Sequence, residues 1–248
     1  MMNISSEKKP LVIIFLTVFI YLLGFGIVIP IIPILSIQMG ASPLQTGLLL
    51  SVYSLMQFLF SPFWGRLSDK YGRRPILLIC LLGEVFSYLL FAWARSIEWL
   101  FIARLFSGFF GASISTASAY ISDITPPNER SKGMALIGAA FGLGFLFGPA
   151  IGGALTVWAD TLSMDPYFKT SFSSYWVSGL CLITFIFAWK YLKESLTPQN
   201  SEQSSAHKNS NRLAQIIKYF KLPTVGPLIF VFFLSSFAMS MMEATLIL

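Results

Sequence analysis

The chain alternates between long apolar runs and shorter polar connections. A helix that spans the hydrocarbon core of a bilayer needs about 20 predominantly apolar residues. Runs of about this length extend over residues 11 to 35, 44 to 64, 75 to 94, 99 to 121, 133 to 159, 173 to 191 and 223 to 248. The pattern therefore predicts an all-α integral membrane protein with seven spanning helices.

Composition supports this interpretation. Hydrophobic residues make up 55% and charged residues 11% of the chain, and the mean hydropathy is +0.72, whereas a soluble domain carries about 25% charged residues. The first run continues through Pro30 and Pro33 without a small-residue cleavage pattern, so it is predicted to be a retained helix and not a signal peptide. Cys80 and Cys181 both fall inside apolar runs, which argues against a disulfide framework or a thiolate metal site.

Basic residues lie between the apolar runs and gather on one side of the predicted membrane. Of the 17 Lys and Arg residues, only Arg95 and Lys169 fall on the opposite side, and Arg104 lies within a run. By the positive-inside rule the rich side is cytoplasmic, and it includes the amino terminus and the polar stretch after the sixth run. Because the net charge of +6 is spread over the connections, it does not indicate nucleic-acid binding.

That polar stretch divides the chain. Residues 1–192 are predicted to form an amino-terminal six-helix bundle, residues 193–222 a cytoplasmic linker, and residues 223–248 the start of a second bundle, which is truncated. Two six-helix halves, each made of inverted three-helix repeats, are the plan of a large group of transporters. The chain ends inside apolar sequence, so a missing carboxy-terminal half is expected. His207, in the linker, is given no role.

The connection between the second and third runs is short and highly charged, from Gly65 to Arg74. Gly65 allows close approach of another helix, Gly72 permits a tight turn, and the arginines can bind carboxylates or anionic lipid headgroups. The string resembles the G-x-L-x-D-x-x-G-R-R/K signature of the major facilitator superfamily, which in that family helps to lock two halves in the outward-facing state. A plain cytoplasmic anchor is the alternative. The resemblance implies a gating role for Gly65, Asp69, Gly72, Arg73 and Arg74.

The polar connection after the fourth run adds two charged residues to this predicted gate. Asp123 stands at the cytoplasmic end of that run and matches a family position that pairs with arginines of the signature. Arg130 follows on the same connection. We include both residues in the predicted gate.

Three charged residues lie deep inside apolar runs, where a charge is costly and a functional role is the default hypothesis. Arg104 shares a helix face with small residues, and Arg104-x-x-Ser107 resembles the buried-arginine motif of proton antiporters, although a structural pairing remains an alternative. Glu84 could line a cavity or be hydrogen-bonded between helices. Glu243 resembles the helix-seven acid of several multidrug exporters. We therefore predict that Arg104, Glu84 and Glu243 take part in proton coupling.

The fifth run carries glycines at a spacing of four, Gly144, Gly148 and Gly152, which places them on one helix face as a groove for close packing. Pro149 removes a backbone donor and is expected to bend the helix. Together with Gly153 the string resembles the G-x-x-x-G-P-x-x-G-G signature of drug:proton antiporters. The glycine spacing alone would indicate ordinary packing, whereas the whole string implies export by exchange.

Within the superfamily the resemblance points to the tetracycline exporters, through residues 53–57 and 65–78. That branch has acidic residues in its first and third helices where this chain has Tyr21 and Ser87, which leaves the substrate open. The sequence thus predicts an exporter of drugs or other small apolar or cationic molecules, exchanging them for protons across the cell membrane without a cofactor or a bound metal. An enzyme is not indicated. The alternatives are an inactive truncated fragment or, remotely, a membrane receptor or scaffold.

Overall fold

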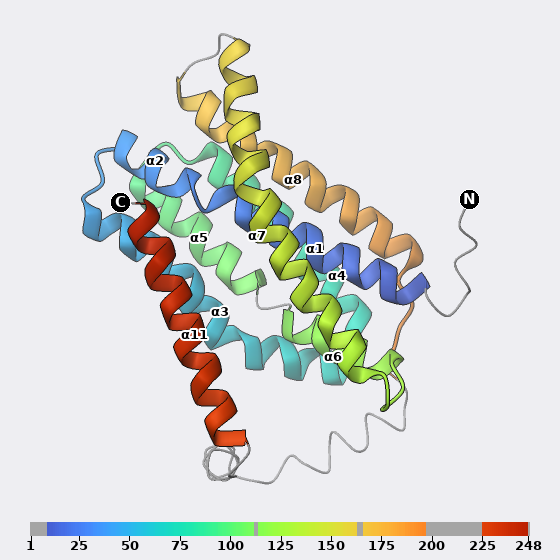
Figure 1. The fold of residues 1–248 in the computed structure, drawn as a ribbon. Helices are drawn as coiled ribbons and strands as arrows, with labels where there is room; N and C mark the ends of the chain where they lie inside the picture. Colours follow the sequence, from blue (N-terminus) through green and yellow to red (C-terminus); the bar gives the residue numbers. More distant parts are fainter. Residues whose placement is uncertain (1–8, 112–113, 163–165, 197–224, 248) are drawn as a thin grey trace. The chain divides into compact units, whose positions relative to one another are not determined.

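The computed structural model describes residues 9–111, 114–162, 166–196 and 225–247, and within these ranges every regular element is an α-helix (Figure 1). The chain divides into two compact units, residues 1–196 and 197–248. The first unit contains α1 (Lys9–Val28), α2 (Ile31–Gln38), α3 (Pro43–Tyr71), α4 (Arg73–Trp93), α5 (Ile97–Gly111), α6 (Ile114–Ile124), α7 (Arg130–Thr161) and α8 (Pro166–Tyr191). The second unit contains α11 (Val225–Ile247).

Six segments in the described part of the chain are long and apolar enough to cross a membrane. They are Leu11–Gln38, Pro43–Tyr71, Arg73–Trp93, Ile97–Ile124, Arg130–Thr161 and Ser171–Tyr191. These segments coincide with the first six apolar runs of the sequence, so the predicted all-helical membrane fold is confirmed. The helix α11, 23 residues long, stands where the seventh was predicted.

The first apolar run contains two helices. The first run is interrupted before Pro30, which has no backbone N–H to continue the hydrogen-bond ladder of α1, and α2 follows directly. The hydroxyls of Ser36 and Thr46 lie 2.9 Å apart and connect α2 to α3. In the fourth run, α5 and α6 stand on either side of residues 112–113, which lie outside the described residues.

The start of α3 is determined by local sequence. Ser42 and Gln45 form a reciprocal capping box, in which the backbone N–H of Ser42 donates to Gln45 Oε1 at 2.8 Å and that of Gln45 donates to Ser42 Oγ at 3.3 Å. Pro43 occupies the first helical turn, where its missing N–H leaves no helical bond unmade. The second span therefore begins at a defined residue.

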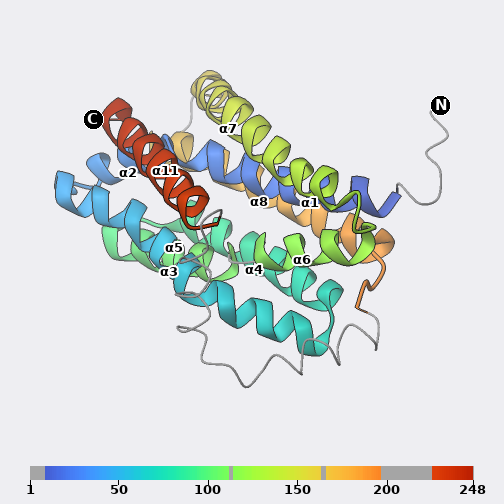
Figure 2. The same cartoon turned by 60° about the horizontal axis from the view of Figure 1, so that its bottom comes forward.

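Within the first unit, α1 packs against α7 and α8, α4 packs against α5 and α8, and α3 packs against α5 (Figures 1 and 2). Aliphatic side chains of α1, including Ile14, Leu22 and Ile27, are completely buried between these helices. Burial of such side chains removes apolar surface from the surroundings and fills the interior at close-packed density. The bundle consequently has its own core.

Three glycines of α7 form the seam with α1. A Cβ atom at Gly144 would lie 2.9 Å from Leu22, and one at Gly148 would lie 2.6 Å from the backbone of Gly26. Gly152 faces Ile27 in the same way, at 3.0 Å. Only residues without a side chain allow the two backbones to approach this closely, so the predicted groove is occupied by α1.

The opposite side of α7 is open. Pro149 and Gly153 are exposed, and a Cβ at Gly153 would have no neighbour within 4 Å among the described residues. Large apolar side chains are exposed nearby and on α3, with Leu146 at 66% and Phe58 at 77%. Pro149 and Gly153 therefore lie outside the seam, although the sequence pattern had grouped them with its glycines.

Candidate functional site

The connection between α3 and α4 consists of Gly72 alone. Its φ of 106° lies in the region that favours glycine. Its N–H donates to the carbonyl of Ser68 at 3.1 Å. A Cβ at this position would lie 2.5 Å from Oε2 and 2.9 Å from Cδ of Glu194. Backbone conformation and available space both require glycine here.

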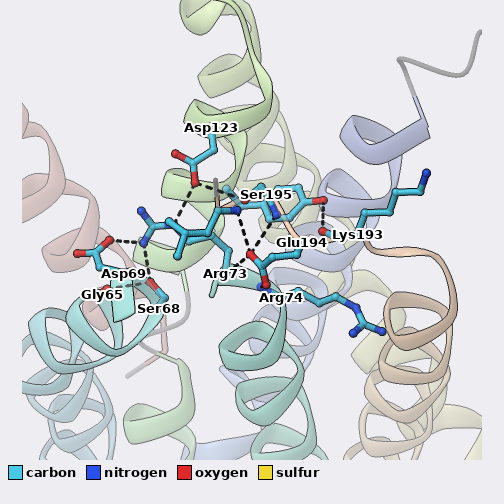
Figure 3. A network of polar contacts seen from close by, with 11 residues as sticks. Gly65, Ser68, Asp69, Arg73, Arg74, Asp123, Lys193, Glu194 and Ser195 are labelled. Atoms are coloured by element: carbon cyan, nitrogen blue, oxygen red, sulfur yellow. Dashed lines mark hydrogen bonds and ion pairs between the residues drawn. The ribbon is translucent and has the colours of Figure 1, made fainter. Parts of the chain in front are cut away.

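Arg73 binds three side chains directly after this turn, as Figure 3 shows. Its Nη1 donates to Ser68 Oγ at 2.7 Å and forms an ion pair with Asp69, one helical turn earlier in the chain. Its Nε donates to Asp123 Oδ2 at 3.1 Å. With a side-chain exposure of only 10%, Arg73 joins α3, α4 and α6 at one end of the bundle.

Glu194, three residues beyond the end of α8, completes what we call the charged network: Ser68, Asp69, Arg73, Asp123, Glu194 and Ser195 (Figure 3). Its Oε1 accepts from the N–H of Arg73 at 2.8 Å and its Oε2 from the N–H of Arg74 at 3.2 Å. A carboxylate at a helix amino terminus is stabilised by the free N–H groups and by the helix dipole. The sequence reasoning missed Glu194, which lies outside the motifs that it considered.

The other predicted gate residues lie at the edge of this network. Nη2 of Arg74 donates to the carbonyl of Trp189 in α8 at 2.6 Å, so the side chain of this arginine fastens α8, and only its backbone N–H donates to a carboxylate, that of Glu194. The carbonyl of Gly65 accepts from Ser68 Oγ at 2.8 Å. Arg130 begins α7 and is exposed, and no hydrogen bond or ion pair joins it to the network within the described residues.

A second polar group, the buried cluster, lies halfway along the helices and consists of Tyr21, Tyr53, Gln57, Glu84, Arg104 and Ser107. Glu84 and Arg104 are 1% and 2% exposed. Ser107 Oγ donates to Glu84 Oε2 at 3.3 Å, which joins α4 to α5. Arg104 Cζ lies 4.4 Å from the centroid of the Tyr53 ring, a cation–π distance.

Two tyrosines and a glutamine connect this cluster to α1 and α3. The hydroxyl of Tyr21 donates to the carbonyl of Gly111 at 3.1 Å and is hydrogen-bonded to the hydroxyl of Tyr53. Gln57 Nε2 donates to the same carbonyl at 3.0 Å and to Tyr21 at 3.4 Å. A Cβ at Gly111 would lie 3.2 Å from Glu84 Oε1. Four helices therefore meet at one polar point inside an apolar bundle.

Comparison with known proteins identifies the family. The model of the Major Facilitator Superfamily matches residues 14–248. The chain belongs to the Major Facilitator Superfamily. It is 31% identical to the tetracycline resistance protein of class B from Escherichia coli over 245 residues, which cover 97% of this chain and 57% of that protein.

Two further similarities agree with this assignment. Multidrug resistance protein 2 of Bacillus subtilis (strain 168) is 29% identical over 239 residues, covering 96% of this chain and 56% of that protein. The crystal structure of the human organic anion transporter TETRAN matches with a TM-score of 0.67 and 29% identity, covering 79% of this chain and 50% of that chain. The chain spans about half the length of the curated relatives it matches. It is a multi-pass membrane protein of a transporter family, and not an enzyme.

In this facilitator chain, the bonding of the buried cluster is incomplete. Oε1 of Glu84 and Nε of Arg104 have no hydrogen-bond partner among the described residues, and no ion pair joins the two side chains there. Buried polar groups are nearly always bonded, and unpaired ones are costly in an apolar interior. The cluster therefore has one unused acceptor and one unused donor, which could bond in another arrangement of the same side chains.

Two further residues named in the sequence analysis remain. Ser87 donates to the carbonyl of Gly83 within α4 at 2.7 Å and does not reach Glu84. Glu243 belongs to α11, but its side chain lies outside the described residues. In the described ranges no group of three or more His, Cys, Asp or Glu side chains gathers as metal ligands would.

Proposed function

We propose that the chain is the amino-terminal half, together with the first helix of the second half, of a proton-coupled exporter of small apolar or cationic molecules. The observation that carries this proposal is the buried cluster: a carboxyl group and a guanidinium inside one membrane bundle, neither of them fully hydrogen-bonded. Ionisable residues at such a depth are expensive and serve function by default. The names of two relatives, a tetracycline and a multidrug resistance protein, support the class of substrate.

In this proposal Glu84 exchanges the proton and Arg104 responds to its charge. When Glu84 is protonated, Ser107 bonds its carboxyl group and Arg104 rests on the face of Tyr53, the arrangement found here. When Glu84 loses its proton, an unpaired charge remains in an apolar interior, and Arg104 gains by moving from the ring toward the carboxylate. This movement of the Arg104 side chain, from the Tyr53 ring on α3 toward Glu84 on α4, would link proton exchange to the packing of these helices.

Two further roles are proposed, one for the second half and one for the first. Glu243 in α11 is proposed as a further proton or cation site, because an acidic residue within an apolar helix carries the same cost as Glu84. The charged network is proposed as a gate, with the end of the bundle that carries it on the cytoplasmic side. Alternating access requires a second bundle to rock against the first, so the 248-residue chain alone is expected not to transport.

The test compares pH-gradient-driven drug accumulation by this chain alone with accumulation by a version extended with a related carboxy-terminal half. We expect activity only in the extended version. In that version Glu84→Gln and Glu243→Gln should abolish the dependence on the gradient. Glu98→Gln is the matched control, because Glu98 is an exposed acid on the first turn of α5. Full gradient dependence in Glu84→Gln would contradict the assignment of the proton site.

The orientation needs a separate measurement. A tag inserted near Ser204 should be inaccessible to an impermeant reagent in intact cells and accessible after permeabilisation. Labelling in intact cells would place the charged network outside and remove the gate assignment. An inactive fragment, the second candidate, is favoured if the extended version also fails to transport while inserting normally into the membrane.

A further inference from the structure

The carboxylate of Glu194 binds backbone amides from two segments that are far apart in sequence. Besides the N–H groups of Arg73 and Arg74, its Oε1 accepts from the N–H groups of Ser195 at 3.0 Å and Leu196 at 3.1 Å. One side chain thus satisfies two amides at the start of α4 and two in the chain that leaves α8. Without it, these four donors would need other partners.

Further contacts fasten the same short segment to the bundle. The hydroxyl of Tyr120 in α6 donates to the carbonyl of Lys193 at 2.8 Å. Ser195 Oγ donates to Asp123 Oδ2 at 3.3 Å, and this oxygen also accepts from Arg73 Nε. Residues 193–195 therefore contact α4 and α6 at the position where Arg73 binds its acidic partners.

The fit between Glu194 and the turn depends on Gly72. A methyl group at Gly72 would occupy the space that the carboxylate fills, since a Cβ there lies 2.5 Å from Oε2. Glu194 is itself exposed, although it is fully engaged. An exposed carboxylate can leave its amides for water at moderate cost, whereas a buried one cannot. The attachment is therefore strong enough to order the turn and weak enough to open.

We propose that Glu194 is a positioning residue for the gate: it ties the chain leaving α8 to the charged turn, so that withdrawal of this segment loosens Arg73 from Asp69 and Asp123. The proposal rests on the gating role proposed above for that turn. It gives residues 193–196, the start of the predicted linker, a role in gating, because a displacement of this segment acts directly on the backbone of Arg73. The connection from this segment to the backbone of Arg73 is the carboxylate of Glu194.

Hydrogen exchange in the full 248-residue chain, reconstituted in lipid nanodiscs, tests the attachment. Glu194→Ala should accelerate exchange of the Arg73 and Arg74 amides about tenfold or more, because it removes charge-assisted bonds. Glu194→Gln, which keeps an acceptor oxygen, should give an intermediate rate. Glu129→Ala is the control, because Glu129 is an exposed acid that pairs only with Lys132 among the described residues. Unchanged exchange at Arg73 and Arg74 would overturn the proposal.

A second readout separates positioning from simple capping. If Glu194 positions Arg73, its removal must also accelerate exchange of the Gly72 amide, which is bonded to the Ser68 carbonyl at the end of α3. A response limited to Arg73 and Arg74 would reduce Glu194 to a local helix cap. In the extended transporter, Glu194→Ala should lower the maximal export rate with little change in KM. Normal export in Glu194→Ala while Asp69→Asn is inactive would refute positioning and leave the gate intact; normal export in Asp69→Asn would refute the gate itself.

Discussion

Arg73 and Arg104 are both almost completely buried, yet their surroundings differ. Arg73 binds Ser68, Asp69 and Asp123 through its side chain, and its backbone N–H is bonded to Glu194. Arg104 lies on the ring of Tyr53, and its Nε has no hydrogen-bond partner in the described structure. One guanidinium is held by hydrogen bonds and ion pairs, and the other by an aromatic face.

The difference follows from position along the helices. Arg73 lies at the junction of helix ends, where backbone groups are not used by the helices and polar side chains can gather. Arg104 lies within a helix whose backbone groups are already bonded to one another, so side chains are its main available partners. The fully bonded site can hold one arrangement firmly, whereas the incompletely bonded site can exchange partners at low cost. We therefore propose that the charged network holds the helix ends in one arrangement, and that the buried cluster switches between two arrangements of its side chains.

The largest effect is expected from Arg104→Leu. Removal of this cation leaves a deprotonated Glu84 buried with no counter-charge to which it could turn, and an uncompensated buried charge costs about 3 to 5 kcal/mol. The double variant Arg104→Leu with Glu84→Leu should regain part of that loss, because no unpaired group remains. Denaturant unfolding in detergent, followed by circular dichroism, measures both. A double variant less stable than Arg104→Leu would show that the two side chains are not coupled.

Second in size is the effect of the charged network on export by the extended transporter. Asp69→Asn keeps the volume of the side chain but removes the charge that Arg73 binds. If this bond stabilises the gate, loss of a charge-assisted bond should lower the export rate about tenfold or more. Arg73→Lys should have a similar effect, because an ammonium group cannot reach three partners in a planar fork. Initial efflux rates, normalised to the amount of protein in the membrane, provide the measurement. Unimpaired export in both variants would reduce the turn to an anchor.

The sequence predicts most of this fold because hydropathy reports directly on lipid exposure. Six apolar runs coincide with six candidate spans. It could not show the interruption before Pro30, since this break lies inside continuous apolar sequence. Nor could the glycine spacing of α7 separate the seam with α1 from the exposed side, because periodicity defines a face and does not identify its neighbour.

The candidate sites were predictable to different degrees. Asp69, Arg73 and Asp123 follow from a local motif with its family resemblance, and they do lie together. Glu194 is about 120 residues away from its partners in sequence, so only the fold reveals it. Tyr53 escaped notice because an aromatic residue in a membrane helix is ordinary. Its role depends on the position of Arg104 over its ring.

A smaller effect is expected at Tyr53, where two substitutions separate the ring from the hydroxyl. Tyr53→Phe removes only the bond to Tyr21 and should cost about 1 kcal/mol of unfolding free energy. Tyr53→Leu also removes the aromatic face beneath Arg104, and a desolvated cation–π contact adds about 2 kcal/mol. Unfolding measurements on the two variants in the same detergent give the difference. Equal losses in both would mean that the hydroxyl alone matters and that Arg104 is not held by the ring.

The smallest effect is expected from Lys132→Ala. The ion pair between Lys132 and Glu129 spans 3.5 Å, with side-chain exposures of 81% and 52%. Water and salt screen such a pair, and it contributes between 0 and about 1 kcal/mol. Asp123→Asn, which removes a comparable single charge from the charged network, should cost more, because Asp123 is only 15% exposed and binds both Arg73 and Ser195. Unfolding at low and high salt extends the test, since raising the salt should erase the contribution of Lys132 and leave most of that of Asp123. If the two variants lost equal stability with equal salt dependence, burial would not be what distinguishes the charged network, and the division between holding and switching sites would lose its physical basis.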